Sequence, residues 1–281
     1  MTELLRNDFE RDVHHYWDTK RADTINIGLG RDDGLVHHHF AVGSYDPTVL
    51  TVPPEQREKA IASELHRMET RQVDIILGAL RDLTPHSRVL DGGSGRGGTA
   101  LLIHRSYGCT VDGVNITAHH NEYARAAAQR LGVRDQVRFH DRNMADTGFE
   151  DASFDAVVTN ETTMYTDVNE VFAEFARVLK PGGQYVLTTW CTNDARPAGP
   201  EAAAIDAHYH CLTHPRREYL SALLAAGLVP HQLDDYTEAA MPYWELRSRS
   251  ELATGIEKPY LDGYRAGRVN YMRICSRKAL R

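Results

Sequence analysis

The chain has few of the features that mark secreted, zinc-binding or membrane proteins. It contains only four cysteines in 281 residues, Cys109, Cys191, Cys211 and Cys275, and no two of them form a C-x-x-C pair. This spacing favours a reduced, cytoplasmic protein without structural zinc. No apolar run approaches the roughly 20 residues of a membrane-spanning helix, so we expect no membrane insertion. The charged residues 1–9 do not resemble a secretory signal.

Positive charge is also scarce. Lysine and arginine number 32 against 39 aspartates and glutamates, which gives a formal net charge of −7. Proteins that hold nucleic acid through its phosphates usually carry an excess of lysine and arginine. The composition therefore argues against a nucleic-acid partner and favours a small-molecule substrate, for which a local basic pocket is enough.

From about residue 87 the sequence alternates between short β-rich runs and helical patterns. We predict strands at 87–90, 109–114, 137–140, 156–159, 184–190, 228–233 and 269–276, and helices at 61–83, 99–107, 121–131, 168–179 and 216–226. Such alternation is typical of an α/β fold with a parallel sheet and right-handed crossovers. The K-P-G-G sequence at 180–183 predicts a turn. Residues 26–46, rich in Gly, His and Asp, are expected to form a loop.

A glycine-rich segment, VLDGGSGRGG at residues 89–98, joins the first predicted strand of this alternation to a helix. Glycine permits positive φ and the close approach of a ligand, and the helix N-terminus offers unpaired N–H groups to negative charge. Gly93, Gly95 and Gly98 also fit the dinucleotide pattern G-x-G-x-x-G. The segment therefore predicts a nucleotide-like cofactor, either a dinucleotide or S-adenosylmethionine (SAM).

Two positions favour SAM over a dinucleotide. A dinucleotide fold usually has an acid at the end of the next strand, but here that strand ends on Asn115. Asp91, at the mouth of the first strand, would repel a pyrophosphate and attract the ammonium group of a methionine moiety. We therefore expect SAM, with Asp91 and Gly93 at its methionine end.

The remaining cofactor contacts are expected at the carboxyl ends of the strands, where parallel sheets bind ligands. We expect the ribose beside Asn115 and His120, and the adenine beside Asn143 and Met144. The N-terminal residues Tyr16 and Trp17 would close the methionine side. The predicted cofactor set is Tyr16, Asp91, Gly93, Gly95, Asn115, His120, Asn143, Met144 and Asn160.

Several segments resemble the geranyl diphosphate 2-C-methyltransferases and related prenyl diphosphate C-methyltransferases, which are class I SAM-dependent methyltransferases. They are DGLVHHHF (33–40), ELHR (64–67), NETTMY (160–165), RREYL (216–220), PYWELR (242–247) and TGIEK (254–258). The resemblance covers about residues 14–270. It implies a Rossmann-like fold with a seven-stranded, mostly parallel sheet, SAM as methyl donor, Mg²⁺ with the substrate diphosphate, and methylation of an alkene carbon. It also implies a homo-oligomer.

Within this resemblance the chain divides into an N-terminal helical cap with a substrate loop, residues 1–86, and a SAM-binding core with substrate-binding insertions, residues 87–281. The family's general base falls on Glu161, and two pocket aromatics fall on Phe40 and Tyr209. Attack of an alkene on a methyl donor leaves a carbocation, which aromatic faces stabilise through cation–π attraction. Tyr165 and Trp190 are further candidates for that task.

The prenyl chain length stays open among isopentenyl, geranyl and farnesyl diphosphate. Tyr209 stands where the geranyl enzymes carry Phe, Phe40 where they carry Tyr, and Val36 replaces an aromatic. From phosphate chemistry and family position, the predicted diphosphate ligands are Asn26, His38, His214, Arg217 and Tyr243. We expect Mg²⁺ to bind through the diphosphate rather than through a protein metal site.

Three consecutive histidines, residues 37–39, could suggest a metal site. Neighbouring side chains of an extended segment point to opposite faces, so we expect a solvated or diphosphate-lining loop instead. The competing function is a SAM-dependent methyltransferase for a sterol or lipid alkene, an amine or a hydroxyl. A SAM-binding regulatory protein is a third possibility, and Glu161 or Tyr209 could instead have purely structural roles.

Overall fold

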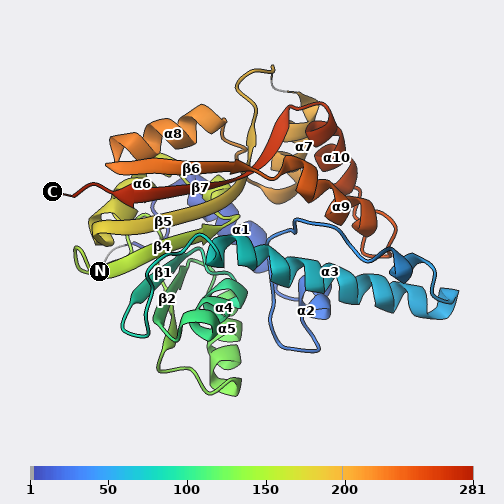
Figure 1. The fold of residues 1–281 in the computed structure, drawn as a ribbon, viewed down its shortest axis with the longest axis horizontal. Coiled ribbons are helices and arrows are strands. Elements are labelled where there is room, and N and C mark those ends of the chain that lie inside the picture. The colour runs from blue at the N-terminus through green and yellow to red at the C-terminus, as the bar shows by residue number, and fades with distance from the viewer. Residues whose placement is uncertain (1–2, 198, 281) are drawn as a thin grey trace.

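A seven-stranded sheet in the order β3-β2-β1-β4-β5-β7-β6 is the centre of the computed structural model, which describes residues 3–197 and 199–280 (Figure 1). The strands are β1 Arg88–Gly92, β2 Thr110–Asn115, β3 Val137–Asp141, β4 Phe154–Asn160, β5 Leu179–Thr192, β6 Leu228–Asp235 and β7 Val269–Lys278. Strand β7 runs antiparallel to β5 and β6, whereas the pairs among β1 to β5 are parallel. The predicted mostly parallel, seven-stranded sheet is confirmed.

Helices cover both faces of the sheet, because its strands are apolar on both sides. In β1, Val89 packs into one core with α4 (Gly98–Tyr107) and α5 (Ala118–Arg130), and the next residue, Leu90, packs into the other with α6 (Val168–Val178) and α8 (Arg216–Ala225). Figure 1 shows α4 and α5 on one side of the sheet and α8 on the other. These four helices match the predicted ones within a few residues.

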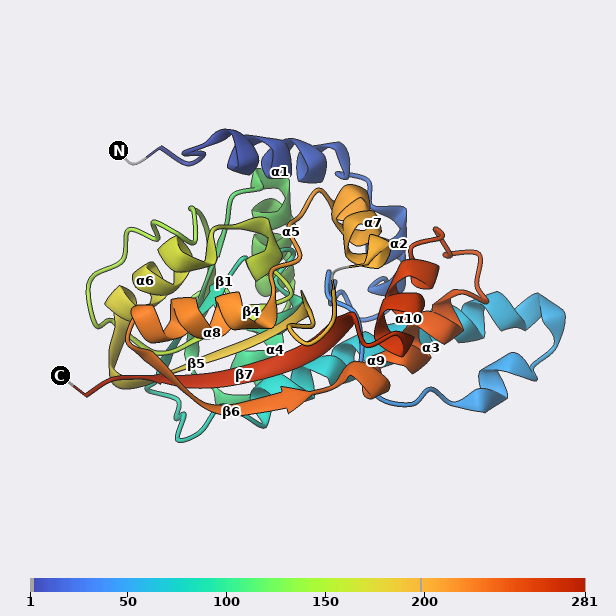
Figure 2. The ribbon, with the colours of Figure 1, turned by 90° about the horizontal axis from the view of Figure 1, so that it is seen from above.

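A third apolar cluster covers one end of the strands. It contains residues of α2 (Thr24–Leu29), α3 (Pro54–Leu77), α7 (Pro200–Tyr209), α9 (Thr237–Arg247) and α10 (Glu257–Arg265), and Figures 1 and 2 show α7, α9 and α10 grouped at this end. The N-terminal helix α1 (Asp8–Thr19) lies along the side of the molecule in Figure 2. Two short 3₁₀ helices, η1 (Pro47–Leu50) and η2 (Thr163–Tyr165), complete the structure.

Three local predictions were wrong. Helix α3 begins at Pro54, which suits a first helical turn, and ends at Leu77, before the predicted end. The expected loop 26–46 begins only after α2, whose first turn is capped by Asp23. Residues 180–183 lie within β5 instead of in a separate turn, and pairing with β4 shifts there from Leu179 to Gln184. Among the described residues no helix is long and apolar enough to span a membrane.

Candidate active site

Two adjoining cavities lie at the carboxyl ends of β1, β2 and β4. We call the larger one the main cavity; its volume is about 940 Å³ including its opening. We call the smaller one the side cavity; its volume is about 450 Å³. Both are lined by Trp17, Gly93, Asn115, Thr162 and Tyr165. From β1 the chain continues to β2 and β3 on one side of the sheet and then to β4 and β5 on the other. Open α/β sheets bind ligands at such a switch point.

The glycine loop leaves no room for side chains at four positions, of which Gly93 and Gly97 also have a backbone that favours glycine. A Cβ on Gly93 would lie 2.0 Å from the Thr162 hydroxyl oxygen, and one on Gly97 would lie 2.6 Å from the ring of Phe139. Both glycines have positive φ, 72° and 88°, which other residues rarely adopt. The loop can therefore bring its backbone directly against a ligand.

Asp91 stands at the end of β1, beside this loop. It is buried, its Oδ2 has no hydrogen-bond partner among the described residues, and burial raises its pKa to about 7. With Gly93, Gly95, His38 and Val36 it lines a third, small cavity of about 320 Å³. A buried carboxylate oxygen without a partner is expensive unless a donor or cation reaches it, so this corner suits a ligand ammonium. Val36 lies here, outside the main cavity, and does not shape that cavity.

The predicted ribose residues also face the cavities. Asn115 lines both of them, and its Nδ2 lies 3.2 Å from Nδ1 of His120. The Nε2 atom of His120 is buried without a partner among the described residues. A ring edge of Trp17 packs on His120 at 5.5 Å between centroids. These groups leave polar atoms available to a hydroxylated ligand.

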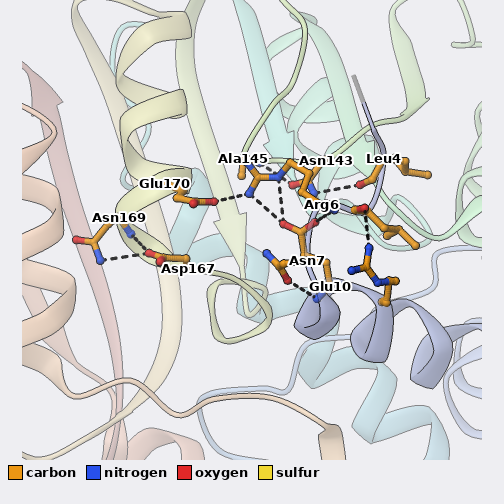
Figure 3. Close-up of polar contacts among 11 residues, drawn as sticks. Leu4, Arg6, Asn7, Glu10, Asn143, Ala145, Asp167, Asn169 and Glu170 are labelled. Atoms are coloured by element: carbon orange, nitrogen blue, oxygen red, sulfur yellow. Dashed lines mark hydrogen bonds and ion pairs between the residues drawn. The ribbon is translucent and has the colours of Figure 1, made fainter. Parts of the chain in front are cut away.

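Asn143 and Met144 line the side cavity, but the side chain of Asn143 is already engaged (Figure 3). Its Nδ2 donates to the Leu4 carbonyl at 3.1 Å, and its Oδ1 accepts the Ala145 N–H at 2.9 Å. Each of these polar atoms can take part in one more hydrogen bond, so the contact of Asn143 with adenine stays a prediction.

The N-terminal segment itself is pinned over the side cavity (Figure 3). The Arg6 guanidinium donates to Glu10 at 3.0 Å and to Glu170 at the start of α6. Glu10, at 5% exposure, lines the side cavity, and α1 continues to Tyr16, which lines the main cavity. Sequence reasoning placed Tyr16 correctly beside the cavity and missed Arg6 and Glu10.

Glu161 follows the last residue of β4 and lines the main cavity. Its backbone has φ 53°, a region that costs a non-glycine residue about 1–3 kcal/mol. Its two carboxylate oxygens accept the Phe40 N–H at 3.0 and 3.1 Å, and Oε1 also accepts the Tyr271 hydroxyl at 2.5 Å. Gln72 donates to that hydroxyl at 2.8 Å. Burial raises the pKa of Glu161 to about 8, and the two donors partly oppose this.

Aromatic side chains surround this carboxylate. Phe40, Tyr165, Trp190 and Tyr209 all line the main cavity with Glu161. The Phe40 ring lies 5.7 Å from that of Trp190 and 5.8 Å from that of Tyr209. The cavity thus joins one buried carboxylate to several ring faces, which suits an apolar substrate that becomes cationic.

Three of the five predicted diphosphate ligands lie outside the main cavity. The side chain of Arg217 is 72% exposed, because α8 starts at the surface, and it pairs with Asp194. His214 is 3.1 Å from Glu218 Oε1 and 3.2 Å from the Thr166 carbonyl. Tyr243 is the third residue outside the cavity, and its buried hydroxyl donates to Glu69 at 2.7 Å. Only Asn26 and His38 line the main cavity.

Arg247, at the end of α9, is the buried cation that sequence reasoning missed. It lines the main cavity, is 7% exposed, lies 3.2 Å from Glu257 and packs over the ring of Trp244. Lys20 and Thr254 line the same cavity. The sequence did contain a signal for these two residues, because Arg247 and Thr254 both lie in segments that carry the family resemblance.

A glycine loop after the first strand of a sheet in this order defines a class I methyltransferase, and a family model described as "Methyltransferase domain" matches residues 90–187. The geranyl diphosphate 2-C-methyltransferase of Saccharopolyspora erythraea is 40% identical over 95% of this chain and 94% of its own length. That of Streptomyces coelicolor is 39% identical over 95% and 92%. The chain belongs to this family of C-methyltransferases.

A solved structure extends the likeness to three dimensions. The geranyl diphosphate C-methyltransferase from Streptomyces coelicolor A3(2), in complex with Mg²⁺, geranyl-S-thiolodiphosphate and S-adenosyl-L-homocysteine, superposes with a TM-score of 0.95. It is 38% identical, and the match covers 99% of this chain and 100% of that one. The fold, its N-terminal helices included, is therefore that of the family.

Proposed function

We propose that the protein methylates an alkene carbon of a prenyl diphosphate with SAM, geranyl diphosphate being the first candidate. The observation that carries this proposal is the Glu161 carboxylate, which faces an aromatic-lined cavity beside the glycine loop. The family relatives support the substrate class, since they are named for geranyl diphosphate. Runner-up acceptors without an anionic group, such as a sterol alkene or a simple hydroxyl, would make no use of a buried cation such as Arg247.

The residues present fit SAM. The orphaned Oδ2 of Asp91 would accept its ammonium group, and the Gly93 backbone can approach it closely. The unpartnered His120 Nε2 and Asn115 lie where hydroxyls of the ribose would be bound. When bound, SAM supplies an electrophilic methyl group.

The protein's part in the reaction is to align, stabilise and deprotonate. The cavity walls hold the alkene in line with the methyl donor, and alignment is worth more for this weak nucleophile than activation. As the carbon–carbon bond forms, the sulfur–methyl bond would break and its electron pair would stay on sulfur. The tertiary carbocation left on the substrate is stabilised by the faces of Phe40, Tyr165, Trp190 and Tyr209, which offer no nucleophile. Glu161 then takes a proton from the methylated carbon, and the C–H electron pair restores the double bond.

The raised pKa of Glu161 suits this role. A carboxyl whose pKa is about 8 holds a proton tightly at neutral pH, so it is a stronger base than an ordinary glutamate. A cation in the main cavity favours the ionised form and lowers this pKa. The base is therefore generated as the site fills, and its negative charge opposes the developing cation.

The diphosphate would be held at the end of the main cavity where Arg247 lies. A guanidinium has five N–H donors, so Arg247 can keep Glu257 and still donate to phosphate oxygens. Lys20, Asn26 and Thr254 face the same cavity. Mg²⁺ prefers oxygen ligands and keeps several waters, so we propose that the diphosphate supplies most of its coordination.

The test is incubation with SAM, Mg²⁺ and a panel of five-, ten- and fifteen-carbon prenyl diphosphates, with methyl incorporation followed by mass spectrometry. Incorporation into a prenyl diphosphate supports the proposal. Incorporation into phosphate-free acceptors alone would favour the runner-up, and SAM binding without any turnover would favour a regulatory protein.

Three further expectations stay proposals. The homo-oligomer is tested by light scattering against the 31.6 kDa of a single chain. The cytoplasmic location is tested by cell fractionation. The division into a cap of residues 1–86 and a core of residues 87–281 is tested by limited proteolysis, which should cut first near the boundary.

A further inference from the structure

The consecutive histidines do not form a solvated loop. His37 and His39 are buried, 2% and 5% exposed, on the face that packs against α3, whereas His38 faces the main cavity and lies 2.7 Å from Arg96. Among the described residues no group of His, Cys, Asp and Glu is arranged to hold a metal ion. The expectation of a solvated or diphosphate-lining loop was therefore wrong for His37 and His39, because this segment packs between α3 and the glycine loop.

A continuous chain of hydrogen bonds runs through these two rings. Thr70 Oγ1 lies 3.2 Å from His37 Nε2, and His37 Nδ1 lies 3.1 Å from His39 Nε2. His39 Nδ1 lies 2.9 Å from the Phe40 carbonyl oxygen. The Phe40 N–H, on the other side of the same residue, donates to both carboxylate oxygens of Glu161.

Because the last acceptor is a carbonyl oxygen, it determines which ring nitrogen carries the hydrogen at each step of this chain. A carbonyl oxygen only accepts, so Nδ1 of His39 carries the hydrogen and, in a neutral ring, Nε2 accepts. His37 must then donate from Nδ1 and accept the Thr70 hydroxyl at Nε2. Burial lowers the pKa of His39 to about 4 and that of His37 well below its ordinary value, so both rings stay neutral near neutral pH. Protonation of His39 at Nε2 would break the chain, because the N–H of His37 Nδ1 would then face a second N–H.

We propose that His37 and His39 are positioning residues that fix the Phe40 backbone and, through its N–H, the carboxylate of Glu161. The inference rests on the proposed function, in which Glu161 is the base. Phe40 has two roles in this arrangement, because its N–H holds the base and its ring lines the cavity where the cation forms. A shift of this one residue would move both groups relative to the substrate.

Other titratable groups face this chain and enter its pH dependence. The ring of His66 lies 5.6 Å from that of His37, and its Nε2 is 3.0 Å from Asp33. His38 lies between Arg96 and Asp23, and Glu69 lies near enough to Glu161 to raise its pKa. The rings of His38, His39 and His66 add to burial in keeping His37 neutral.

The kinetic test compares His39→Leu with His39→Asn on the prenyl diphosphate that the wild type methylates. His39→Leu should lower kcat roughly 10- to 100-fold, the effect of a misplaced catalytic group, while the Kd of SAM changes less than about twofold. His39→Asn should recover part of the activity, because its amide can donate to the Phe40 carbonyl. The acid limb of the pH profile should move to higher pH in His39→Leu, because loss of the N–H clamp disfavours the ionised carboxylate.

The matched control is His104→Leu, which removes a ring whose Nδ1 likewise lies 2.7 Å from a backbone carbonyl, that of Cys109, but which lines none of the three cavities, and it should leave kcat and the pH profile unchanged. Product analysis adds a second readout. A displaced base leaves the carbocation to water, which adds to the cationic carbon and releases a proton, so His39→Leu should yield more methylated alcohol. Wild-type kcat, pH profile and products in His39→Leu would overturn the proposal.

A measurement without turnover separates this inference from the proposed function. Nitrogen-15 NMR of histidine-labelled wild-type protein should show His37 and His39 as neutral rings protonated at Nδ1 from pH 6 to 8, with signals assigned through the His39→Asn variant and Thr70→Val. Rings protonated at Nε2, or titrating near the ordinary histidine pKa of about 6.5, would overturn the chain even if methylation is normal. Absence of prenyl methylation by the wild type would instead overturn the proposed function.

Discussion

Replacing Tyr271 with Phe removes one of the two donors that hold Glu161. The hydroxyl lies 2.5 Å from Oε1 and lowers the pKa of Glu161, which burial raises to about 8. A hydrogen bond to a charged group contributes about 1.5–3 kcal/mol, and about 1.4 kcal/mol corresponds to one pKa unit. Tyr271→Phe should therefore raise the pKa of Glu161 by about one unit or more.

The consequence for activity follows from the ionised fraction. At pH 7.5 a carboxyl of pKa 8 is about 24% ionised and one of pKa 9 about 3%, so the active form falls about eightfold. Activity should fall by that order at pH 7.5 and recover as the pH approaches 9.5. The assay is kcat/KM for the prenyl diphosphate across pH 6 to 10.

Tyr185→Phe is the matched control. It removes a buried hydroxyl from β5 that lies 2.9 Å from Thr159 Oγ1 and does not contact Glu161. Its pH profile should match that of the wild type. A Tyr271→Phe profile that falls equally at every pH, or does not change, would refute the reasoning, because the hydroxyl would then not control ionisation of the base.

Four further predictions concern the cofactor, the diphosphate, the cavity and stability. Asp91→Asn should weaken SAM binding roughly 10-fold or more in calorimetry, because it removes a buried charge opposite the ammonium group; an unchanged Kd would contradict the assignment. Arg247→Gln should raise KM for the prenyl diphosphate roughly 10- to 100-fold and change kcat less, whereas exposed Arg217→Gln should not; equal effects would exclude Arg247 as a ligand. Tyr209→Leu should shift preference toward longer prenyl chains by about 10-fold, and an unchanged ratio across the panel would place the pocket floor elsewhere. Glu161 holds its proton more tightly when folded, at a pKa of about 8 against 4.5, so its contribution to stability is present at low pH and lost as pH rises from 4.5 through 8. Glu161→Gln should therefore raise the free energy of unfolding by up to about 3–5 kcal/mol at pH 9 and have little effect at pH 5, and equal changes at both pH values in denaturant titrations would argue against the raised pKa.

Much of the fold was predictable, because the period of apolar residues changes where strands give way to helices. All seven strands and the helices α4, α5, α6 and α8 follow from that alternation. The helices α7, α9 and α10 were not predicted. Helix α9 contains Pro242, and its buried side chains include the polar Thr237 and the charged Arg247 beside Ala240 and Trp244, so no purely apolar stripe marks it.

The site residues also fall into two groups, those that the strand pattern locates and those that depend on the packing of helices. Residues next to strand ends, such as Asp91, Asn115 and Glu161, were predictable because parallel strands bring their carboxyl ends together. Arg247 and Glu10 were not, since they reach the cavities from α9 and α1, helices whose position depends on tertiary packing. Alternation predicted that His37 and His39 share a face, but only the structure shows that this face is buried.

The most direct test of the account is a crystal structure of the protein with S-adenosylhomocysteine, Mg²⁺ and a thiolodiphosphate analogue of its substrate. The account predicts that the alkene lies among Phe40, Trp190 and Tyr209, with the Glu161 carboxylate still held by Phe40 and Tyr271 and turned toward the carbon that loses its proton. An alkene bound elsewhere, or a Glu161 side chain directed away from it, would contradict the central claim.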